Sequence, residues 1–172
     1  ASAGDTYQRL GFILYCQISI TMATLTEAHK QTLKETWVMV KAKGPLEDTG
    51  LTMFVKLFQK NPELLPIFPF ADEGLDNIPK SARVKRHGAN VMKMVDTAIS
   101  ILDDMDTVAA ALTDLGKRHR RYKATPAHFG PVGDALLATL EEGLKDAWTP
   151  EVKEAWVTIF GIITTVMSAQ LS

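Results

Sequence analysis

The chain has 172 residues, of which 46% are hydrophobic and 23% charged, and these values are typical of one soluble globular domain. Its formal net charge of −1, with no block of like charge, argues against nucleic acid or an anionic membrane as the main partner. The single cysteine, Cys16, excludes an intrachain disulfide and fits a reducing, cytoplasmic location. No apolar run reaches the ~20 residues that a helix needs to span a bilayer, so we expect no transmembrane segment.

Residues 1–23 differ in character from the remainder of the chain. Their apolar stretch, Leu10–Ile20, could be a short signal-type region, although Arg9 is the only basic residue before it. Cys16, which lies beside apolar residues, could instead accept a lipid. In the third alternative, everything before Met22 is an extension without a role in the fold. We therefore predict an N-terminal extension of uncertain role over 1–23 and a folded domain over 24–172.

From Thr24 onward the apolar residues recur with a helical period. Thr24 or Thr26 can cap the first helix, Thr149 can cap the last, and prolines suit first turns. These signals predict helices over 26–43 and 45–60, a short helical turn over 63–68, a loop over 69–78, a helix that Pro79 opens and that continues through Ala98, a helix from the Asp103-Asp104 turn to the break at 124–126, a helix from Pro126 through Leu140, and a helix from Pro150 through Met167.

The remaining patterns that would indicate another fold class are missing from the sequence. We find no alternation of apolar and polar residues typical of strands, no internal repeat and no low-complexity segment. The sequence therefore predicts an all-α protein with seven to eight helices in one domain.

Two of the four histidines lie on apolar helix faces. His87 precedes Val91 by four residues, and His119 follows Leu115 by four, so each pair shares one face of its helix. Two such helices facing each other would form an apolar slot with an imidazole on each wall. An imidazole in an apolar pocket is what a protein offers to haem iron.

The other two histidines have simpler interpretations. His29 lies among polar residues and is expected to be solvated, and His128 follows Pro126 in a capping or surface position. A zinc site built from His87 and His119 is disfavoured, because no cysteine or carboxylate lies on their helix faces at ligand spacing. A helical protein without haem, in which both histidines are packing residues, is a further alternative.

Several segments resemble the globin family. They occur in the family's order over roughly 24–171, and they are most similar to the neuroglobin-like, or nerve-type, intracellular globins. The segments are PELLPIF (62–68), VKRHGANVM (84–92), LTDLGKRH (112–119), FGPVGDALLATLEE (129–142), TPEVKEAW (149–156) and the Phe160-Gly161 pair.

This resemblance implies a globin fold, a three-over-three sandwich of helices around a haem pocket. The cofactor would be haem b (iron protoporphyrin IX), with His119 and His87 as the residues at the metal. Carried over position by position, His119 is the proximal iron ligand, His87 the distal histidine, Phe68 the phenylalanine stacked on the porphyrin, Phe54 and Val91 lining of the distal side, and Leu115, Phe129, Val132 and Phe160 walls of the pocket.

The sequence departs from the neuroglobin pattern at two places near the haem propionates. Phe70 stands where the pattern has a tyrosine, so that hydrogen bond would be absent, and Asn90 stands where it has a lysine, which puts a salt bridge there in doubt. Lys123, Arg118 and Arg121 are candidates to replace that lysine as the cation near a propionate. A run of cations near a helix end, however, usually complements the helix dipole.

The implied function is reversible binding of dioxygen or other diatomic gases, carbon monoxide and nitric oxide among them, for storage, transport or sensing. The proximal imidazole is expected to donate its other ring nitrogen to a carbonyl of its own helix, which fixes the tautomer. His87 can donate to bound dioxygen or act as an internal sixth iron ligand, in which case it competes with the gas.

The alternative function is a redox enzyme such as a nitric oxide dioxygenase or nitrite reductase. The sequence holds no flavin or nicotinamide fingerprint, so sustained turnover would need a separate reductase. We expect no dedicated enzyme activity, and the sequence leaves a homodimer open.

Overall fold

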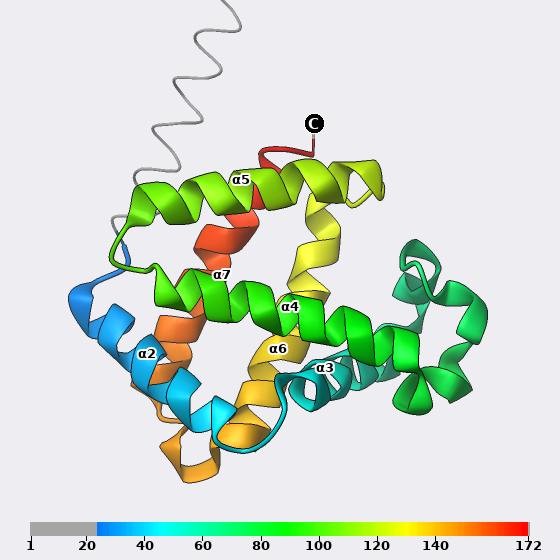
Figure 1. Ribbon diagram of the computed structural model, residues 1–172, viewed down its shortest axis with the longest axis horizontal. Coiled ribbons are helices and arrows are strands. Elements are labelled where there is room, and N and C mark those ends of the chain that lie inside the picture. Colours follow the sequence, from blue (N-terminus) through cyan, green and yellow to red (C-terminus); the bar gives the residue numbers. More distant parts are fainter. Residues whose placement is uncertain (1–23, 172) are drawn as a thin grey trace, which may run out of the picture.

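The structure, a computed structural model, describes residues 24–171, which form α-helices and 3-10 helices and contain no strand. The α-helices are α2 (Glu27–Lys41), α3 (Leu46–Lys60), α4 (Ala82–Ser100), α5 (Met105–Arg121), α6 (Phe129–Leu144) and α7 (Pro150–Ser168) (Figure 1). The 3-10 helices are η1 (Pro62–Ile67), η2 (Ala71–Glu73), η3 (Leu75–Lys80), η4 (Pro126–His128) and η5 (Lys145–Ala147). The all-α prediction is confirmed. The predictions for 1–23 lie outside the described residues.

Side-chain caps begin four of the six α-helices that the structure describes. The predicted caps Thr26 and Thr149 accept hydrogen bonds from the backbone N–H groups of His29 at 3.1 Å and Val152 at 3.3 Å. Asp104, at the predicted turn, caps α5 in the same way through Thr107 at 3.0 Å. These caps satisfy amide groups that have no partner inside their own helix.

Two predictions about residues 69–80 are wrong. Pro79 lies inside η3 rather than at the start of the next helix, and α4 begins at Ala82 after Ser81. The Ser81 hydroxyl accepts from the Val84 amide at 3.1 Å, which makes serine rather than proline the start signal. The predicted loop over 69–78 contains η2 and part of η3. Segments this short leave no clear helical period in a sequence.

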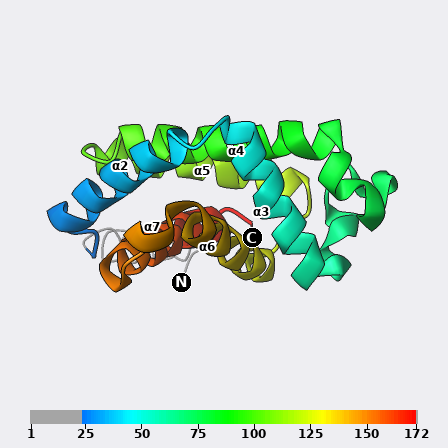
Figure 2. The same cartoon turned by 90° about the horizontal axis from the view of Figure 1, so that it is seen from below.

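The helices form two layers that α3 connects. Figure 2 shows α2, α4 and α5 on one side and α6 and α7 on the other. Helix α3 packs against both α4 and α6, and α7 packs against α2 and α5. As Figure 1 shows, α4 and α5 run side by side across the face of the molecule, with α6 and α7 behind them.

Two tryptophans join the layers at one end of the core. The rings of Trp37 on α2 and Trp156 on α7 lie 5.9 Å apart between centroids. The Trp156 indole N–H donates to the Thr36 hydroxyl at 3.1 Å, and the Trp37 indole N–H donates to Asp96 of α4 at 2.7 Å. Both indole groups therefore have acceptors, the buried Thr36 hydroxyl and the half-buried Asp96 carboxylate.

Helices α3 and α4 cross at a pair of glycines, Gly50 and Gly88. A Cβ added at Gly88 would lie 2.5 Å from the carbonyl carbon of Gly50, closer than side-chain carbons approach backbone. The crossing therefore brings the two backbones together where only glycine fits. Because His87 directly precedes Gly88, this contact also fixes the position of that histidine.

Candidate functional site

His119 lies in the last turn of α5, and its ring is held by its own helix. The His119 Nδ1 atom lies 2.9 Å from the carbonyl oxygen of Leu115. A carbonyl can only accept, so Nδ1 carries the hydrogen, and in the neutral ring Nε2 keeps its lone pair free. This is the backbone contact that the sequence analysis expects of a histidine presenting Nε2 to a metal.

His87 lies on α4 among phenylalanine rings. Its ring centroid is 5.2 Å from that of Phe54, 5.6 Å from that of Phe70 and 6.0 Å from that of Phe68. Burial lowers the pKa of His87, and the nearby His119 lowers it further through charge repulsion. His87 is therefore neutral at physiological pH, and the two imidazoles lie within electrostatic reach of each other.

The phenylalanines form one aromatic cluster beside His87. Phe54 lies edge-on to Phe68 at 5.4 Å and to Phe70 at 5.8 Å, and Phe58 lies edge-on to Phe68 at 5.2 Å. Phe70 is 1% exposed, so the position where the neuroglobin pattern has a tyrosine is here part of the apolar cluster. Asn90, the second departure from that pattern, is exposed on α4.

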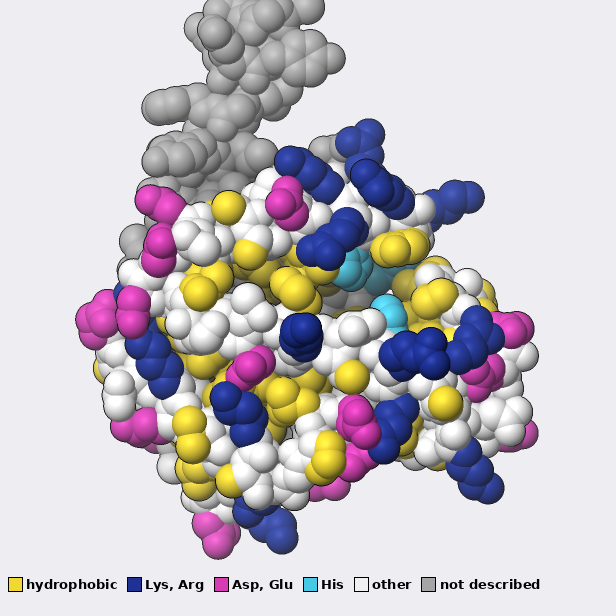
Figure 3. Space-filling view, in the orientation of Figure 1, with side chains coloured by type: hydrophobic (Ala, Val, Ile, Leu, Met, Phe, Trp, Pro, Cys, Tyr) yellow, Lys and Arg dark blue, Asp and Glu magenta, His cyan; other side chains and the backbone are white. Residues whose placement is uncertain are grey.

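The nine predicted site residues are unevenly buried. Phe54 and Phe129 are buried, whereas the other seven are only half-buried although most are apolar: Phe68, His87, Val91, Leu115, His119, Val132 and Phe160. Figure 3 shows histidine side chains on both sides of a hollow between α4 and α5. Apolar side chains that face a hollow remain partly accessible, which agrees with the half-buried state of these residues.

The structure joins some of these residues directly and others only through the core. On the α5 side, the ring of Phe129 lies 6.2 Å from His119. The Phe160 ring of α7 lies against Gly133 of α6, next to Val132, at a distance that leaves no room for a larger residue at 133. Val91, Leu115, Val132 and Phe160 pack against the buried core.

An arginine that the sequence analysis did not single out holds the segment before α4. Arg83 Nη1 lies 2.8 Å and 2.7 Å from the two carboxylate oxygens of Asp72, and its Nε lies 3.6 Å from Glu73. Arg83 also donates to the carbonyl of Pro69, and it lowers the pKa of the Asp72 carboxyl. We call this set the Arg83 clamp. It ties the Phe68–Phe70 segment to α4 one turn before His87.

His29 and His128 do not belong to this site. The backbone N–H of Thr125 donates to His128 Nδ1 at 3.1 Å, so the predicted capping role is confirmed. His29 takes part in a similar capping box with Thr26 and remains partly exposed. Within residues 24–171, no group of three or more His, Cys, Asp or Glu side chains could hold a metal ion alone.

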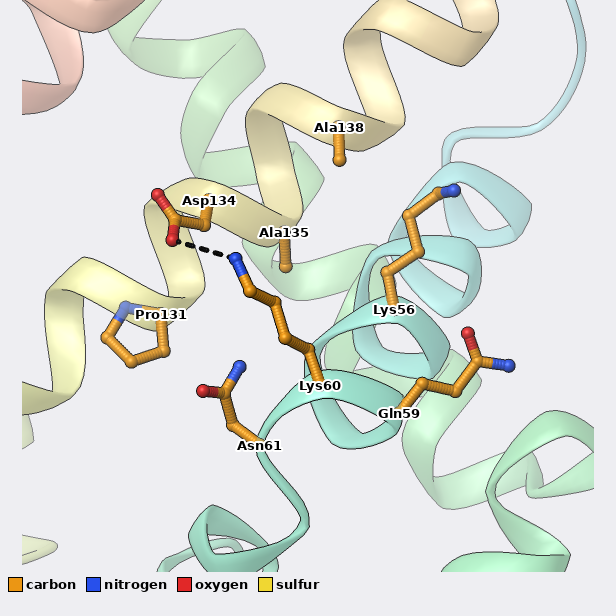
Figure 4. A pocket seen from close by; sticks show the side chains of 8 residues that line it. All are labelled: Lys56, Gln59, Lys60, Asn61, Pro131, Asp134, Ala135 and Ala138. Carbon is orange, nitrogen blue, oxygen red and sulfur yellow. Dashed lines mark hydrogen bonds and ion pairs between the residues drawn. The ribbon is translucent and has the colours of Figure 1, made fainter.

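A separate pocket of about 300 Å³ lies between α3 and α6 (Figure 4). It contains none of the predicted site residues. Its lysines are already paired: Lys60 with Asp134 at 3.3 Å and Lys56 with Glu142 at 2.5 Å. The two lysines that line the pocket are therefore already neutralised by neighbouring carboxylates.

A family model described as Globin matches residues 51–167, and the chain belongs to the globin family. Among globins, it is similar to the neuroglobins of Danio rerio and Chaenocephalus aceratus, each 31% identical over 150 residues, which cover 86% of this chain and 92% of the relative. The fold is also that of a hexacoordinated haem protein from an anhydrobiotic tardigrade, with a TM-score of 0.76, 21% identity, and coverage of 86% of this chain and 96% of that one.

No helix among residues 24–171 has the length and apolar character of a membrane span.

Proposed function

We propose that the chain binds haem b between α4 and α5 and reversibly binds dioxygen or another diatomic gas such as carbon monoxide or nitric oxide. The observation that carries this proposal is the pair of imidazoles on facing helices. His119 presents Nε2 because Nδ1 is bound to Leu115, and His87 is neutral because of its burial. Both rings are therefore in the form that can bind iron.

The residues around the hollow fit a flat apolar cofactor. Half-buried apolar side chains from four helices and the edge-on rings of the aromatic cluster would exclude water from both faces of a porphyrin. We assign His119 as proximal ligand, Phe68 as the ring on the porphyrin, Phe54 and Val91 to the distal side, and Leu115, Phe129, Val132 and Phe160 to the walls. Haem supplies an iron that binds diatomic gases in its ferrous state.

His87 can serve in two ways in this arrangement. As a neutral imidazole it can donate a hydrogen bond to bound dioxygen, whose outer oxygen becomes partly negative. It can also bind the iron itself, and an external gas must then displace it, so the apparent affinity falls by the fraction of open state. The description of the tardigrade protein as hexacoordinated supports the second role.

The absorption spectrum of the reduced, gas-free protein tests these roles. We expect sharp, split visible bands because His87 occupies the sixth position, and His87→Leu should convert them to one broad band. A single broad band in the unmodified protein would show that the sixth position is open and that His87 is not a resting ligand.

Haem retention tests the proximal assignment. His119→Ala should abolish stable haem binding in a hemin titration, because it removes the ligand that Leu115 orients. His128→Ala is the matched control, since that histidine caps η4 and should leave the titration unchanged. Equal haem affinity in the His119 variant and the control would refute the assignment, and a colourless protein that takes up no hemin would remove the whole proposal.

A further inference from the structure

The C-terminal end of α5 carries a dense group of cations around His119. Lys117, Arg118, Arg120 and Arg121 lie in the last turns of the helix and Lys123 just after it, and all five are exposed. We call these five residues the basic face. Figure 3 shows Lys and Arg side chains gathered over this end of α5, beside the histidines of the hollow.

The four cations of the basic face that lie on α5 point away from the side of the helix that carries His119. Successive helical residues are rotated by about 100°. His119 therefore lies roughly opposite Lys117, while Lys117, Arg118, Arg120 and Arg121 together span about 160° of the outer surface. The same turn presents an iron ligand inward and a continuous row of positive charge outward.

Helix-dipole complementation does not account for so many cations. Helices α2 and α3 end with one lysine each in the last turn, and α4, α6 and α7 end with none, whereas α5 has three arginines and a histidine there. Within residues 24–171, the only ion pair of the basic face is Lys117 with Asp114 at 3.7 Å. Its other cations are available to a partner.

An exposed aromatic ring connects this surface to the site. Tyr122, which lies between Arg121 and Lys123, is 66% exposed, and its ring meets the ring of His119 edge-on at 6.5 Å. A large exposed aromatic side chain surrounded by cations is typical of a protein contact surface. A partner docked here would lie one side chain away from the proximal ligand.

We propose that the basic face with Tyr122 is a docking surface for an acidic electron-donor protein that reduces the haem iron, a proposal that rests on the proposed function. In the transfer, the donor loses one electron, for example from an anionic flavin hydroquinone that becomes a neutral semiquinone, and ferric iron becomes ferrous. No proton or bond is exchanged. Charge complementarity would orient the donor and accelerate its encounter with the chain.

The remainder of the molecule favours a compact acidic protein over a membrane or a nucleic acid. Since the whole chain has a net charge of −1, the surface outside the basic face carries an excess of negative charge. An extended anionic surface would meet that repulsion, whereas a small acidic patch would contact only the basic face.

Binding of oxidised flavodoxin, an acidic redox protein, tests the docking surface without turnover. The titration uses the haem-loaded ferric chain at low and at moderate salt. We expect Lys117→Glu/Arg120→Glu to weaken binding at least about tenfold at low salt, and we expect added salt to weaken the unmodified complex similarly. The control is Lys43→Glu/Lys153→Glu, which makes the same charge change on exposed residues at α2's end and on α7, and should change binding less than about twofold.

Stopped-flow reduction by flavodoxin hydroquinone provides the second readout. The Lys117→Glu/Arg120→Glu variant should be reduced at least about tenfold more slowly than the control at low salt. Its hemin titration and reduced spectrum should match the unmodified chain, because neither residue faces the hollow. Equal flavodoxin binding by the variant and the control would overturn the docking surface.

Two further outcomes separate the proposals. Charge-dependent binding to phosphatidylserine vesicles, with none to flavodoxin, would make the basic face a membrane site and overturn the inference. A chain that takes up no haem would remove the proposed function instead, and the flavodoxin titration on that chain would still decide whether the basic face docks an acidic protein.

Discussion

Gly88 shows how one residue without a side chain sets the position of its neighbour His87. A methyl group at this position would lie 2.5 Å from the carbonyl carbon of Gly50, so α4 must move away from α3 to accommodate it. We expect Gly88→Ala to destabilise the protein by about 2 kcal/mol or more and to change the rate at which carbon monoxide displaces His87. Urea unfolding and flash photolysis measure the two effects.

Gly161 is the matched control for Gly88. It lies inside α7, and a Cβ built there meets no atom within 4 Å. Gly161→Ala should therefore stabilise the protein by up to about 1 kcal/mol, because alanine restricts the unfolded chain and favours the helix. If both substitutions changed stability equally, helix propensity rather than the α3–α4 crossing would explain the result.

Asp96 contributes to stability in a way that depends on pH. Hydrogen bonds from Lys41 and from the Trp37 indole lower the pKa of Asp96 from its ordinary value of 3.8. The contribution is therefore fully present above pH 3.8 and is lost as the pH falls through the lower pKa of the folded state. It is modest, because the Asp96 side chain is 40% exposed and its ion pair with Lys41 is screened by water.

Asp96→Ala removes this contribution together with the acceptor of the Trp37 indole N–H. We expect a loss of about 1 kcal/mol at pH 7, mainly because the buried Trp37 indole N–H loses its acceptor. The difference from the unmodified protein should shrink as the pH falls below 3.8. Urea unfolding of both proteins at several pH values measures it, and a difference that stays constant down to pH 3 would contradict the assigned cause.

At the scale of elements, the Arg83 clamp connects the segment between η1 and η3 to α4. Arg83→Ala should release this segment, because the arginine contacts Asp72, Glu73 and the Pro69 carbonyl together. We expect faster amide hydrogen exchange over 69–74 and faster exchange of His87 with external carbon monoxide. Unchanged exchange over 69–74 would show that the aromatic cluster alone holds the segment.

Arg86→Ala provides the comparison for the clamp. Arg86 is an exposed arginine of the same helix that makes no ion pair within residues 24–171. Hydrogen exchange over 69–74 in this variant should match the unmodified protein. High salt should mimic Arg83→Ala, since the clamp is exposed and therefore screened.

The long helices could be predicted because each has a continuous apolar face, a cap or a proline near its start. The predicted starts of α2 and α7 are confirmed, because Thr26 and Thr149 cap these helices. The predicted start of α4 at Pro79 is wrong, because Pro79 and Ser81 both resemble start signals and only the tertiary structure distinguishes them. The 3-10 helices are too short to show a period.

Some residues of the candidate site could be singled out from the sequence, and others could not. His87 and His119 could be singled out because each lies four residues from an apolar partner on its helix, whereas their assignment to haem rests on the resemblance to globins. Gly50 could have been suspected, since an isolated glycine inside a helix often marks close packing. Arg83 and Tyr122 could not have been singled out from the sequence. The role of Arg83 depends on Asp72 and that of Tyr122 on the ring of His119, and folding brings each pair together.

At the scale of the whole molecule, haem would act as part of the core. A cofactor that binds only the folded chain stabilises it by mass action, by about 2.7 kcal/mol at a free concentration 100 times its dissociation constant. For a chain of this length we expect a rise in Tm of roughly 5–10 °C on hemin addition. Differential scanning calorimetry measures it, and His119→Ala should remove the rise. A Tm that hemin leaves unchanged would mean that the hollow does not hold the cofactor.

The paired tryptophans give the molecule its own optical probe. Indoles emit light at wavelengths that haem absorbs. A haem held between α4 and α5 would therefore quench the fluorescence of Trp37 and Trp156 by energy transfer. Loss of haem would restore the emission without any attached dye. The two rings lie 5.9 Å apart; Trp37 is hydrogen-bonded to Asp96 of α4, and Trp156 is hydrogen-bonded to Thr36 of α2. A shift in the emission maximum would therefore also report separation of the layers.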